Sequence, residues 1–423
     1  MKKLNILYVD FSVGFGGSAV SLKNLTRGIN AMGHNIVVAF IFQKKKSLDR
    51  KNLFPGNTKV IYLGDLVTDA FLKISRYLYD NDALVKTKIS FFLMFFIKIF
   101  AERIPTVVKL FFLIKTEGID VVHVNNGISI PIILSANLAK TPCIISLRSF
   151  VNETLASRRI LRNVRCFVAN SQAVKNDFIQ KSNLQKDVVR VIYNRIDPDK
   201  VALAVSQRTD TDELRQSVRP GQKIIGTAGR FLEWKRQDLL ILTMEALLRR
   251  GIDVMCFIIG TSEKTIESKN YETLLKDMVR AKNLEKNIVF TGFLENPLNL
   301  MKELDVFVLP SIVEPFGNVV LESMTLGVPV VAFNEGGPAE IINNGQDGIL
   351  VPTGDVAALT EAVFRLLSDQ DLHTTLSRNA VQKVKTDFSL DQSIRQWDDL
   401  YRDLTQDREP GPVLNKPREG RDS

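Results

Sequence analysis

The sequence predicts an α/β fold in which two domains each contain a parallel sheet. Three observations predict it: a length of 423 residues, the alternation of short apolar runs with longer segments of helical period, and a polar stretch at residues 199–222. One hydrophobic core seldom grows beyond about 250–300 residues, so a chain of this length is expected to form two domains. Short buried runs separated by helical segments are typical of parallel sheets covered by helices.

Short apolar runs mark the predicted strands, and helices are expected between them because parallel strands need crossover connections. In the first half these runs lie at residues 4–10, 35–42, 59–63, 119–124, 143–147, 166–169 and 188–193. In the second half they lie at residues 223–228, 253–259, 287–290, 305–309, 328–332 and 348–351.

The polar stretch at residues 199–222 is the predicted linker, since it holds no apolar run long enough for a strand and ends in Pro220-Gly221. We therefore expect a first domain over residues 1–205 and a second over residues 206–388. A C-terminal helix at residues 389–404 is expected to pack back toward the first domain. Residues 405–423 lack an apolar pattern, which is typical of a disordered tail.

Charge is distributed unevenly between the two halves. Residues 1–208 carry 31 Lys and Arg against 14 Asp and Glu, whereas residues 209–423 carry 25 against 33. A basic half can attract nucleic acid, an anionic membrane or a phosphorylated substrate. The sequence has no helix-turn-helix or RNA-binding signature and no basic-aromatic repeat, which argues against nucleic acid and favours a membrane surface.

The cysteines and histidines exclude several kinds of site. Three widely separated cysteines fit neither a disulfide framework nor a zinc site, so a reducing cytoplasm is expected. With three histidines and no metal-binding spacing, we predict neither a metal site nor a Ser-His-Asp triad. The apolar run at residues 4–9 is too short for a secretory signal.

Residues 89–114 are the one segment that resembles a membrane span. Lys98, Glu102, Arg103, Pro105 and Lys109 interrupt it, whereas a spanning helix needs about 20 nearly uninterrupted apolar residues. Two interpretations stay open. The segment is either a pair of core helices or a helix in a membrane interface, with its Phe face inserted and its lysines among the headgroups.

A glycine loop follows the first predicted strand and contains Gly16 and Gly17. Glycines let the backbone approach a ligand closely, and the start of the following helix offers unpaired N–H groups to an anion. A tight turn between strand and helix explains the glycines equally well, because the loop matches neither the dinucleotide fingerprint nor the Walker spacing.

The densest set of candidate functional residues follows the strand predicted at residues 305–309. Pro315 suits the first turn of a helix, which would put Glu314 at the helix mouth and Glu322 one turn inside. The Glu322 carboxylate could accept ribose hydroxyls while nearby amides hold a phosphate. Those amides belong to Gly317, Asn318 and Val319. Alternatively, Glu314 complements the helix dipole and Glu322 lies on a solvated face.

Two cations follow the strand predicted at residues 223–228. Arg230 and Lys235 are expected at the carboxyl edge of the sheet, where open α/β sheets bind ligands, and they could clamp a diphosphate. The alternative interpretation makes Lys235 and Arg236 surface charges that open the helix running to Arg250. His123 ends the strand at residues 119–124, and a buried strand-end histidine is its default interpretation.

Together these strings resemble glycosyltransferase family 4, whose members are retaining enzymes of GT-B fold that use a nucleotide-sugar without a metal. The resemblance is close across about residues 223–370 and rests in the first half on the glycine loop, the strand at residues 120–126 and the turns at residues 170–171 and 193–197. The strings that carry it are Gly16-Gly17, Gly229-Arg230 with Lys235, the E-x7-E motif from Glu314 to Glu322, Gly327-Val328-Pro329, Gly336-Gly337-Pro338 and Asp347-Gly348.

The resemblance implies two Rossmann-like domains whose parallel sheets face a central cleft. It implies that Glu322 binds the ribose, that Glu314 orients the hydroxyls of the donor sugar, and that Arg230 and Lys235 clamp the diphosphate. The backbone at Gly317, Asn318 and Val319 would join the donor site, and Gly16 and Gly17 would meet the diphosphate from the other domain. Candidates for contact with the sugar or the acceptor are His123, Asn125 and Arg148, although Asn125 departs from the family pattern.

The implied function is transfer of a hexose or related sugar from a UDP- or GDP-sugar to a glycan acceptor in bacterial-type surface polysaccharide or glycolipid assembly. A lipid-linked acceptor and a place at the inner face of the cytoplasmic membrane are expected, with the basic N-terminal half touching anionic lipid. No cofactor is expected besides the donor substrate. A sugar-nucleotide epimerase and an inactive nucleotide-sugar-binding scaffold are the alternatives.

Overall fold

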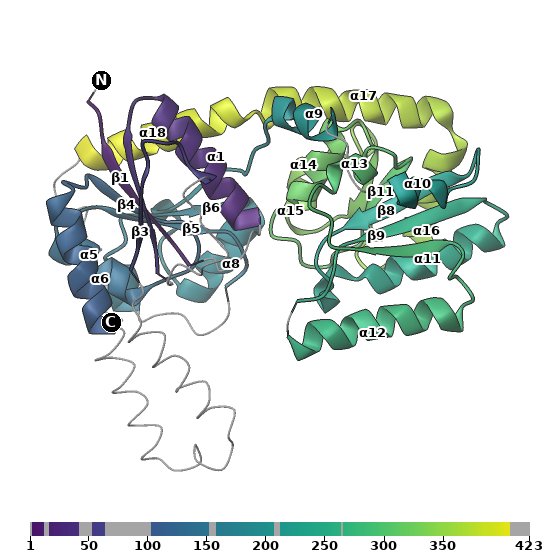
Figure 1. Cartoon of the computed structure of the whole chain (residues 1–423), viewed down its shortest axis with the longest axis horizontal. Helices are drawn as coiled ribbons and strands as arrows, with labels where there is room; N and C mark the ends of the chain where they lie inside the picture. Colours follow the sequence, from purple (N-terminus) through teal and green to yellow (C-terminus); the bar gives the residue numbers. More distant parts are fainter. Residues whose placement is uncertain are drawn as a thin grey trace, which may run out of the picture. The chain divides into compact units, whose positions relative to one another are not determined.

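The computed structural model describes residues 2–11, 17–41, 53–63, 103–151, 158–206, 212–263 and 265–406. Gly16, most of the apolar segment 89–114 and the predicted tail after Gln406 lie outside these ranges. The chain divides into two compact units (Figure 1). The first unit comprises Met1–Asn170, Val174–Ile192 and Ile394–Ser423, and the second comprises Ser171–Ala173 and Tyr193–Ser393.

The change of unit after Ile192 lies earlier in the chain than the boundary expected at residue 205. Part of the predicted linker forms helix α9 (Pro198–Ser206), which packs against α13 (Leu298–Met301) and α14 (Asn318–Thr325) of the second unit. Burial of Val201 in this short amphipathic helix gives the segment a place in the second unit. The sequence suggested a linker here because α9 is short and Val201 is its only buried residue.

The first unit contains a seven-stranded parallel sheet in the order β3-β2-β1-β4-β5-β6-β7. Each strand falls where a short apolar run predicted one, which confirms this half of the fold class. The strands are β1 (Asn5–Asp10), β2 (Asn35–Phe40), β3 (Lys59–Tyr62), β4 (Val121–Val124), β5 (Cys143–Leu147), β6 (Cys166–Ala169) and β7 (Val189–Val191).

Alternating side chains of these strands pack into helices on the two faces of the sheet. On β1, Leu7 and Val9 belong to the core that includes α5 (Ile104–Thr116), α6 (Ile130–Leu138) and α8 (Gln172–Ser182). Tyr8 lies on the other face, where it meets Tyr401 of α18 (Leu390–Gln406). The other helical segments among the described residues of this unit are α1 (Gly17–Ala31), α7 (Arg158–Leu161) and the 3-10 turn η3 (Lys186–Val188).

Helix α18 supplies a large part of this second core, although it comes from the end of the chain. The side chains of Ile394, Trp397, Leu400 and Tyr401 are all buried and recur every three or four residues, so they share one helix face. The fit is tight at Gly28 of α1, where an added Cβ would lie 2.4 Å from the Ile394 side chain.

The second unit contains a six-stranded parallel sheet in the order β10-β9-β8-β11-β12-β13. All of its strands again match predicted apolar runs, which confirms the α/β class with two parallel sheets. They are β8 (Lys223–Ala228), β9 (Val254–Ile259), β10 (Ile288–Gly292), β11 (Val306–Leu309), β12 (Val330–Phe333) and β13 (Ile349–Val351).

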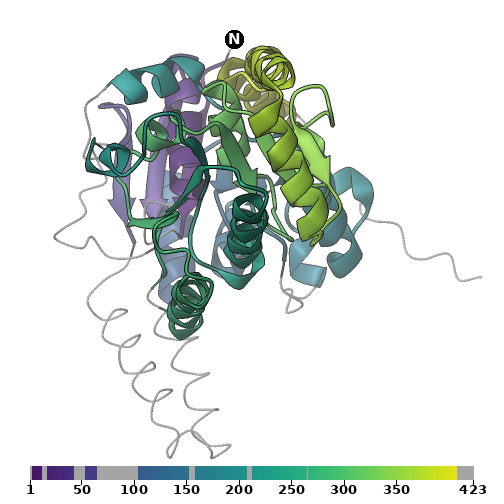
Figure 2. The ribbon, with the colours of Figure 1, turned by 90° about the vertical axis from the view of Figure 1, so that its right-hand side faces the viewer.

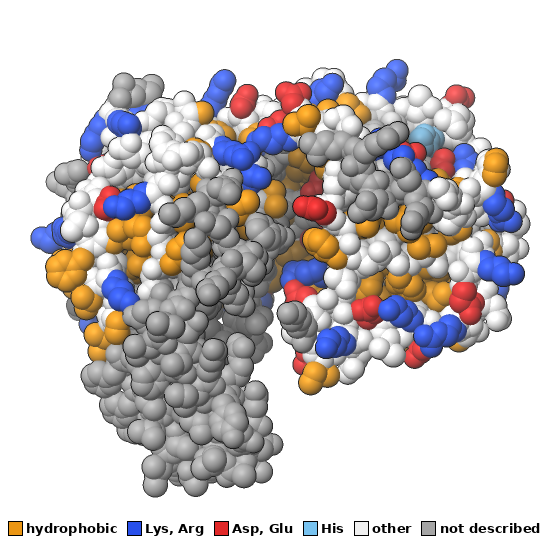
Figure 3. Space-filling view, viewed as in Figure 1, with side chains coloured by type: hydrophobic (Ala, Val, Ile, Leu, Met, Phe, Trp, Pro, Cys, Tyr) orange, Lys and Arg blue, Asp and Glu red, His pale blue; other side chains and the backbone are white. Residues whose placement is uncertain are grey.

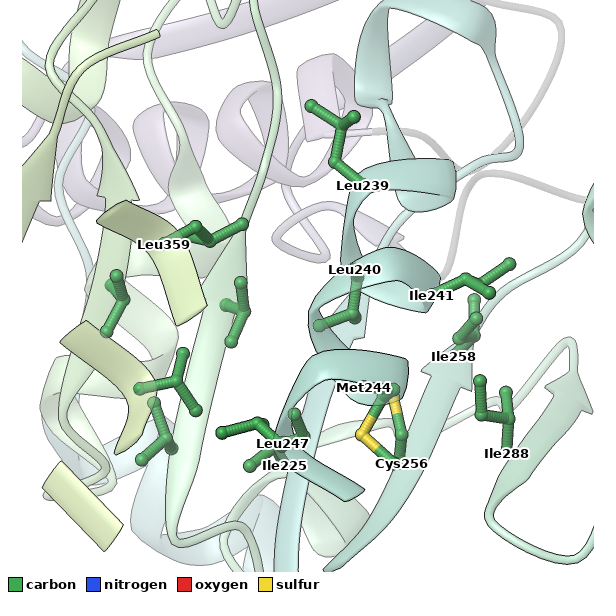
Figure 4. Close-up of a cluster of buried hydrophobic side chains, with 14 of the residues drawn as sticks. Ile225, Leu239, Leu240, Ile241, Met244, Leu247, Cys256, Ile258, Ile288 and Leu359 are labelled. Carbon is green, nitrogen blue, oxygen red and sulfur yellow. The ribbon is translucent and has the colours of Figure 1, made fainter. Parts of the chain in front are cut away.

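Both faces of this sheet are covered, and each has its own hydrophobic core. One core joins strands to α11 (Gln237–Arg249), α12 (Ile266–Ala281) and α16 (Val356–Ser368). In Figure 4, Ile241, Met244 and Leu247 of α11 lie beside Ile258, Cys256 and Ile225, respectively. The other core contains α13, α14 and α17 (Gln370–Asp387). Helices of this unit appear in front of its strands in the turned view of Figure 2. Its remaining segments are α10 (Asp212–Gln216), η4 (Glu233–Lys235) and α15 (Gly336–Ile341).

Helix α5 is the described part of the apolar segment at residues 89–114. It has 13 residues, fewer than a bilayer requires. Across the ranges that the structure describes, no helix has both the length and the apolar character of a membrane span.

Candidate active site

The candidate site of the second unit lies at the carboxyl ends of neighbouring strands. Because β8, β11 and β12 are adjacent and parallel, the loops that follow them leave the sheet at the same edge. The loop after β8 carries Arg230 and Lys235, the loop after β11 carries Glu314, and Gly336-Gly337 follow β12. The sequence analysis expected Arg230 and Lys235 at this edge and Glu314 after the strand that is β11.

Lys235 and Glu314 form an ion pair between the first two loops. The Lys235 Nζ bonds the Glu314 Oε2, and the two side chains are only 13% and 9% exposed. Nζ also lies 4.3 Å from the centre of the Trp234 ring, a cation-π arrangement that the sequence analysis missed. A nearly buried charge needs such partners, so each residue holds the other in place.

Close backbone packing fixes the position of Glu314. The Gly337 N–H donates to the Glu314 carbonyl at 2.9 Å. A Cβ added to Gly337 would lie 2.1 Å from the Phe316 Cα, closer than non-bonded atoms can approach. Gly337 is therefore required by the close approach of the two loops, and Gly336 also has a left-handed φ of 61° that favours glycine.

Helix α14 begins at Asn318, later than the sequence predicts. Gly317 is its N-cap and has a φ of 95°, a left-handed conformation that ends any helical run through Pro315. The prediction that Pro315 lies in the first helical turn is therefore wrong. The first amides of α14 have no partner within the helix, which leaves N–H groups of Asn318 and Val319 at the carboxyl edge of the sheet. Asn194 reaches this helix start, where its Nδ2 donates to the Asn318 Oδ1 at 3.1 Å.

Glu322 lies in α14, four residues after Asn318, as the sequence analysis expected. Its side chain is half-buried rather than on a solvated face. Burial raises the pKa of the Glu322 carboxyl to about 7, because the protein disfavours the charged form more than water does. A carboxyl in this state can accept hydroxyl hydrogens once it is ionised.

Arg230, which was predicted to bind the diphosphate, forms an ion pair with an acidic side chain of the protein. Its guanidinium pairs with Glu263, and the two side chains are 63% and 37% exposed. Glu263 follows β9, the strand next to β8, so the same sheet edge brings it near. The sequence analysis missed Glu263, although its place four residues after β9 could have indicated it. The alternative interpretation, in which Lys235 is a surface charge at the start of the next helix, is not supported. Lys235 is the last residue of η4, and α11 begins at Gln237.

Three strands of the first unit also present polar residues at one edge. Asp10 ends β1, Asn125 follows β4 and Arg148 follows β5, and these strands are neighbours in the sheet. The Arg148 Nε donates to the Asn125 carbonyl and its Nη2 to the Asn125 Oδ1, both at 2.8 Å. Burial lowers the pKa of Arg148 to about 10, while the charge of Asp10 acts in the opposite direction. The structure therefore joins two of the predicted contact residues, Asn125 and Arg148.

His123 is fully buried in the core between the sheet and α18. Its Nδ1 lies 2.7 Å from the Tyr401 hydroxyl and its Nε2 lies 2.7 Å from the Ser146 Oγ. The imidazole stacks on Trp397 with ring centres 4.7 Å apart. Burial, with a smaller effect of Arg148, holds the pKa of His123 well below its usual range. This environment favours the default interpretation of a strand-end histidine over contact with a sugar.

Two other expectations concern residues at the limit of what the structure describes. Gly16 lies outside the described ranges, and Gly17 is the first residue of α1. Within those ranges, no group of three or more His, Cys, Asp or Glu side chains is arranged to hold a metal ion.

Two sequence families divide the chain between them. Residues 15–200 match Glycosyltransferase Family 4, and residues 210–383 match Glycosyl transferases group 1. The first match covers strands of the first unit, and the second covers the loops that carry Lys235 and Glu314 and the helix that carries Glu322.

Several of the curated relatives are bacterial glycosyltransferases. The capsular polysaccharide biosynthesis glycosyltransferase CapM of Staphylococcus aureus is 25% identical over 248 residues, which are 57% of this chain and 62% of CapM. This alignment thus spans less than two thirds of the relative. The UDP-Gal:alpha-D-GlcNAc-diphosphoundecaprenol alpha-1,3-galactosyltransferase of Escherichia coli is 25% identical over 72% of this chain and 80% of its own length.

Solved structures share the fold over nearly the whole chain. HepE of Anabaena, crystallised with UDP, aligns with a TM-score of 0.72 at 21% identity and covers 95% of this chain and 100% of its own. Its complex with UDP-glucose aligns with a TM-score of 0.71 at 22% identity, over 95% of this chain and 100% of that one. With the two matching families and the two parallel-sheet units, these findings identify the chain as a GT-B glycosyltransferase of the family 4 and group 1 type.

Proposed function

We propose that this protein transfers a hexose or related sugar, with retention of configuration, from a UDP- or GDP-sugar to a glycan acceptor. The observation that carries the proposal is the Lys235–Glu314 pair beside the start of α14, with Glu322 one turn inside that helix. A cation, unpaired helix amides and two carboxylates at one sheet edge suit the diphosphate, the ribose and the sugar of such a donor.

The chemistry follows from the charges that develop during transfer. As the bond between the sugar and the diphosphate breaks, negative charge grows on the phosphate oxygens and positive charge grows on the anomeric carbon. Lys235 and the amides of Asn318 and Val319 stabilise the negative charge, and Arg230 joins them when the diphosphate displaces Glu263. Glu314 holds sugar hydroxyls. In the proposed retaining reaction the leaving phosphate accepts the proton of the acceptor hydroxyl on the same face, so no side-chain base is required. Lys235 and the helix amides would stabilise the diphosphate without a metal.

The class of acceptor is supported by the relatives. CapM belongs to capsular polysaccharide biosynthesis, and the Escherichia coli relative acts on a sugar linked to diphosphoundecaprenol. We propose a glycan acceptor of this lipid-linked kind, and a role in surface polysaccharide or glycolipid assembly.

A panel of nucleotide-sugars tests the donor and the reaction. We expect one UDP- or GDP-sugar to raise the Tm of the purified protein and to be hydrolysed slowly, releasing the free nucleotide. An epimerase would instead return the nucleotide joined to an altered sugar, and an inactive scaffold would bind without turnover. Either result would contradict the proposal.

Two variants test the assigned roles. Lys235→Ala should lower kcat by about 10² to 10³, because it removes a charge that stabilises the leaving group. Glu322→Ala should weaken nucleotide binding and leave the fold intact. Unchanged nucleotide affinity in Glu322→Ala, measured by calorimetry, would contradict the assignment of this carboxylate to the ribose.

Membrane contact through the basic N-terminal half is the second part of the proposal. On α5 the exposed side chains of Ile104, Val108 and Phe112 recur every four residues, with exposed fractions of 44%, 46% and 59%. Helix α6 packs beside α5 and exposes Leu134 and Leu138, by 37% and 62%. Figure 3 shows apolar side chains gathered over these two helices.

Positive charges accompany this α5–α6 surface. Residues 103–116 and 129–141 include four cationic residues and no acidic one. The cationic residues are Arg103, Lys109, Lys115 and Lys140. An apolar face with cationic residues fits a bilayer of anionic lipid, since apolar side chains enter the interface while cations stay with the headgroups. This surface supports our proposal that the enzyme works at the inner face of the cytoplasmic membrane.

Flotation with vesicles tests this surface. The protein should float with anionic vesicles at low salt and remain unbound with neutral ones, and Phe112→Ser with Leu138→Ser should abolish flotation. Leu274→Ser is the matched control, because Leu274 is 50% exposed on α12 of the second unit. Absence of flotation, or flotation that the paired substitution leaves unchanged, would contradict membrane contact by α5 and α6.

A further inference from the structure

Arg236, the residue after Lys235, has an unusual backbone conformation. It lies between η4 and α11 with a φ of 50° and a ψ of 41°. This left-handed region favours glycine or asparagine, because the Cβ of other residues crowds the backbone there. The conformation matters for the site, since it sets the direction in which the chain leaves Lys235.

Asp238 binds the Arg236 side chain in two places. The Arg236 Nε donates to Oδ1 at 3.0 Å and Nη2 donates to Oδ2 at 2.8 Å. Such a two-pronged pair restricts both side chains. The pair is partly buried, with exposed fractions of 33% for Arg236 and 16% for Asp238.

Tyr271 connects this turn to α12. Its hydroxyl donates to the Asp238 Oδ1 at 2.9 Å and accepts the Asp238 N–H at 3.3 Å. Tyr271 is 5% exposed and lies on the buried face of α12, so it cannot shift without disturbing the core. Burial raises the pKa of Tyr271, which keeps the hydroxyl protonated as a donor.

The other end of the same loop is held in the same way. Ser268, one turn before Tyr271 on α12, donates its Oγ to the Phe231 carbonyl at 2.5 Å. The Gln237 Nε2 donates to the Arg230 carbonyl at 3.1 Å. Residues 230–238 are therefore attached to α12 at both ends, and Lys235 lies between the attachments.

We propose that Asp238 and Tyr271 are positioning residues that hold Arg236 in its left-handed conformation and thereby place the Lys235 ammonium for the donor diphosphate. In this role Arg236 contacts Asp238 and not the donor. The inference rests on the proposed function for its ligand, but the state of the loop can be measured without any ligand.

Glycine provides the decisive test, because it adopts the left-handed conformation without being held there. Asp238→Ala should raise the Kd for UDP at least tenfold, whereas Arg236→Gly should stay within threefold of the wild-type value. In the Arg236→Gly background, Asp238→Ala should then change the Kd less than threefold. Asp277→Ala is the matched control, since Asp277 pairs with Arg280 on the exposed side of α12.

Three results would overturn the inference. The first is a loss of UDP binding in Arg236→Gly as large as that in Asp238→Ala, which would make the guanidinium a donor contact. The second is an equal effect of Asp238→Ala in both backgrounds, and the third is no effect of Asp238→Ala on the Kd in the wild-type background. If Asp238→Ala lowers the Tm and leaves the Kd for UDP unchanged, Asp238 has a role in stability alone.

Fluorescence of Trp234 separates this inference from the proposed function. The chain has two tryptophans, so Trp397→Phe leaves Trp234 as the only reporter, directly beside Lys235. In the absence of ligand, Asp238→Ala should lower the anisotropy of Trp234, and Arg236→Gly should remove that effect. A protein that binds no nucleotide would refute the proposed function, whereas unchanged anisotropy would refute the positioning role.

Discussion

Replacement of Glu322 by glutamine should stabilise the protein at alkaline pH while weakening its binding of nucleotide. The substitution keeps the size of the side chain and removes its charge. In the folded protein, burial raises the pKa of Glu322 to about 7 from an ordinary value of 4.5. The unfolded chain therefore ionises this carboxyl at a lower pH than the folded protein does.

The magnitude follows from the difference between the two pKa values. Between pH 4.5 and 7 the unfolded state loses the proton and the folded state keeps it, so the free energy of unfolding falls as pH rises, by about 1.4 kcal/mol per pH unit. From pH 5.5 to 8.5 this group should cost the wild type about 2 kcal/mol, which the glutamine variant avoids. For a domain of this size, 2 kcal/mol corresponds to a difference in Tm of about 4–8 °C.

Thermal unfolding of both proteins at pH 5.5 and pH 8.5 measures the effect. Other groups titrate in both proteins, so the quantity of interest is the change with pH in the difference between their Tm values. Glu361→Gln is the matched control, because Glu361 on α16 is 54% exposed. A difference between wild type and Glu322→Gln that stays constant across this range would refute the reasoning. So would tighter UDP binding by the variant at pH 8.5.

Three further substitutions follow from the described contacts. Gly337→Ala should lower the free energy of unfolding in urea by about 1–3 kcal/mol and impair UDP binding, because its Cβ would meet the backbone of Phe316. Gly56→Ala is the control, because a Cβ at Gly56 would lie in open space. Equal effects of the two substitutions would contradict the role of close packing. His123→Gln should flatten the loss of stability in acid. The wild type keeps His123 neutral when folded but protonates it when unfolded below pH 6.5, so its free energy of unfolding falls as the pH falls below that value, and parallel pH profiles would contradict this. Glu314→Gln should lower kcat for the donor sugar while UDP binding changes less, since Glu314 is assigned to the sugar; an equal loss of both would contradict that assignment.

The strands could be predicted because burial alone determines their sequence pattern. Both sheets are covered on two faces, so each strand is a short continuous apolar run and is visible without knowledge of its neighbours. Once strands alternate with helices, the parallel order places their carboxyl ends at one edge. The residues after β8 and β11 lie at this edge, where Lys235 and Glu314 form an ion pair.

Features that depend on contacts between distant loops could not be predicted in the same way. The start of α14 was placed too early because the left-handed conformation of Gly317 is set where its loop packs against Gly337. Arg230 pairs with Glu263 of the loop after β9. The sequence of each loop does not show how far it extends beyond the sheet, so this pairing could not be predicted. Helix α9 was assigned to a linker because the burial of Val201 depends on the second unit as a whole.

The course of the chain through α18 constrains how the protein is made. The ribosome synthesises strands β1 to β7 early, but the side chains of Trp397, Leu400 and Tyr401 that cover one side of them emerge only after the strands of both sheets. Until then the newly made sheet exposes Tyr8 and His123 to water or to a chaperone. A fragment ending at Ile192 would therefore be expressed with one apolar face of its sheet uncovered. Removal of even the last turns of α18 would destabilise the first unit more than the second, because those turns pack against the first unit.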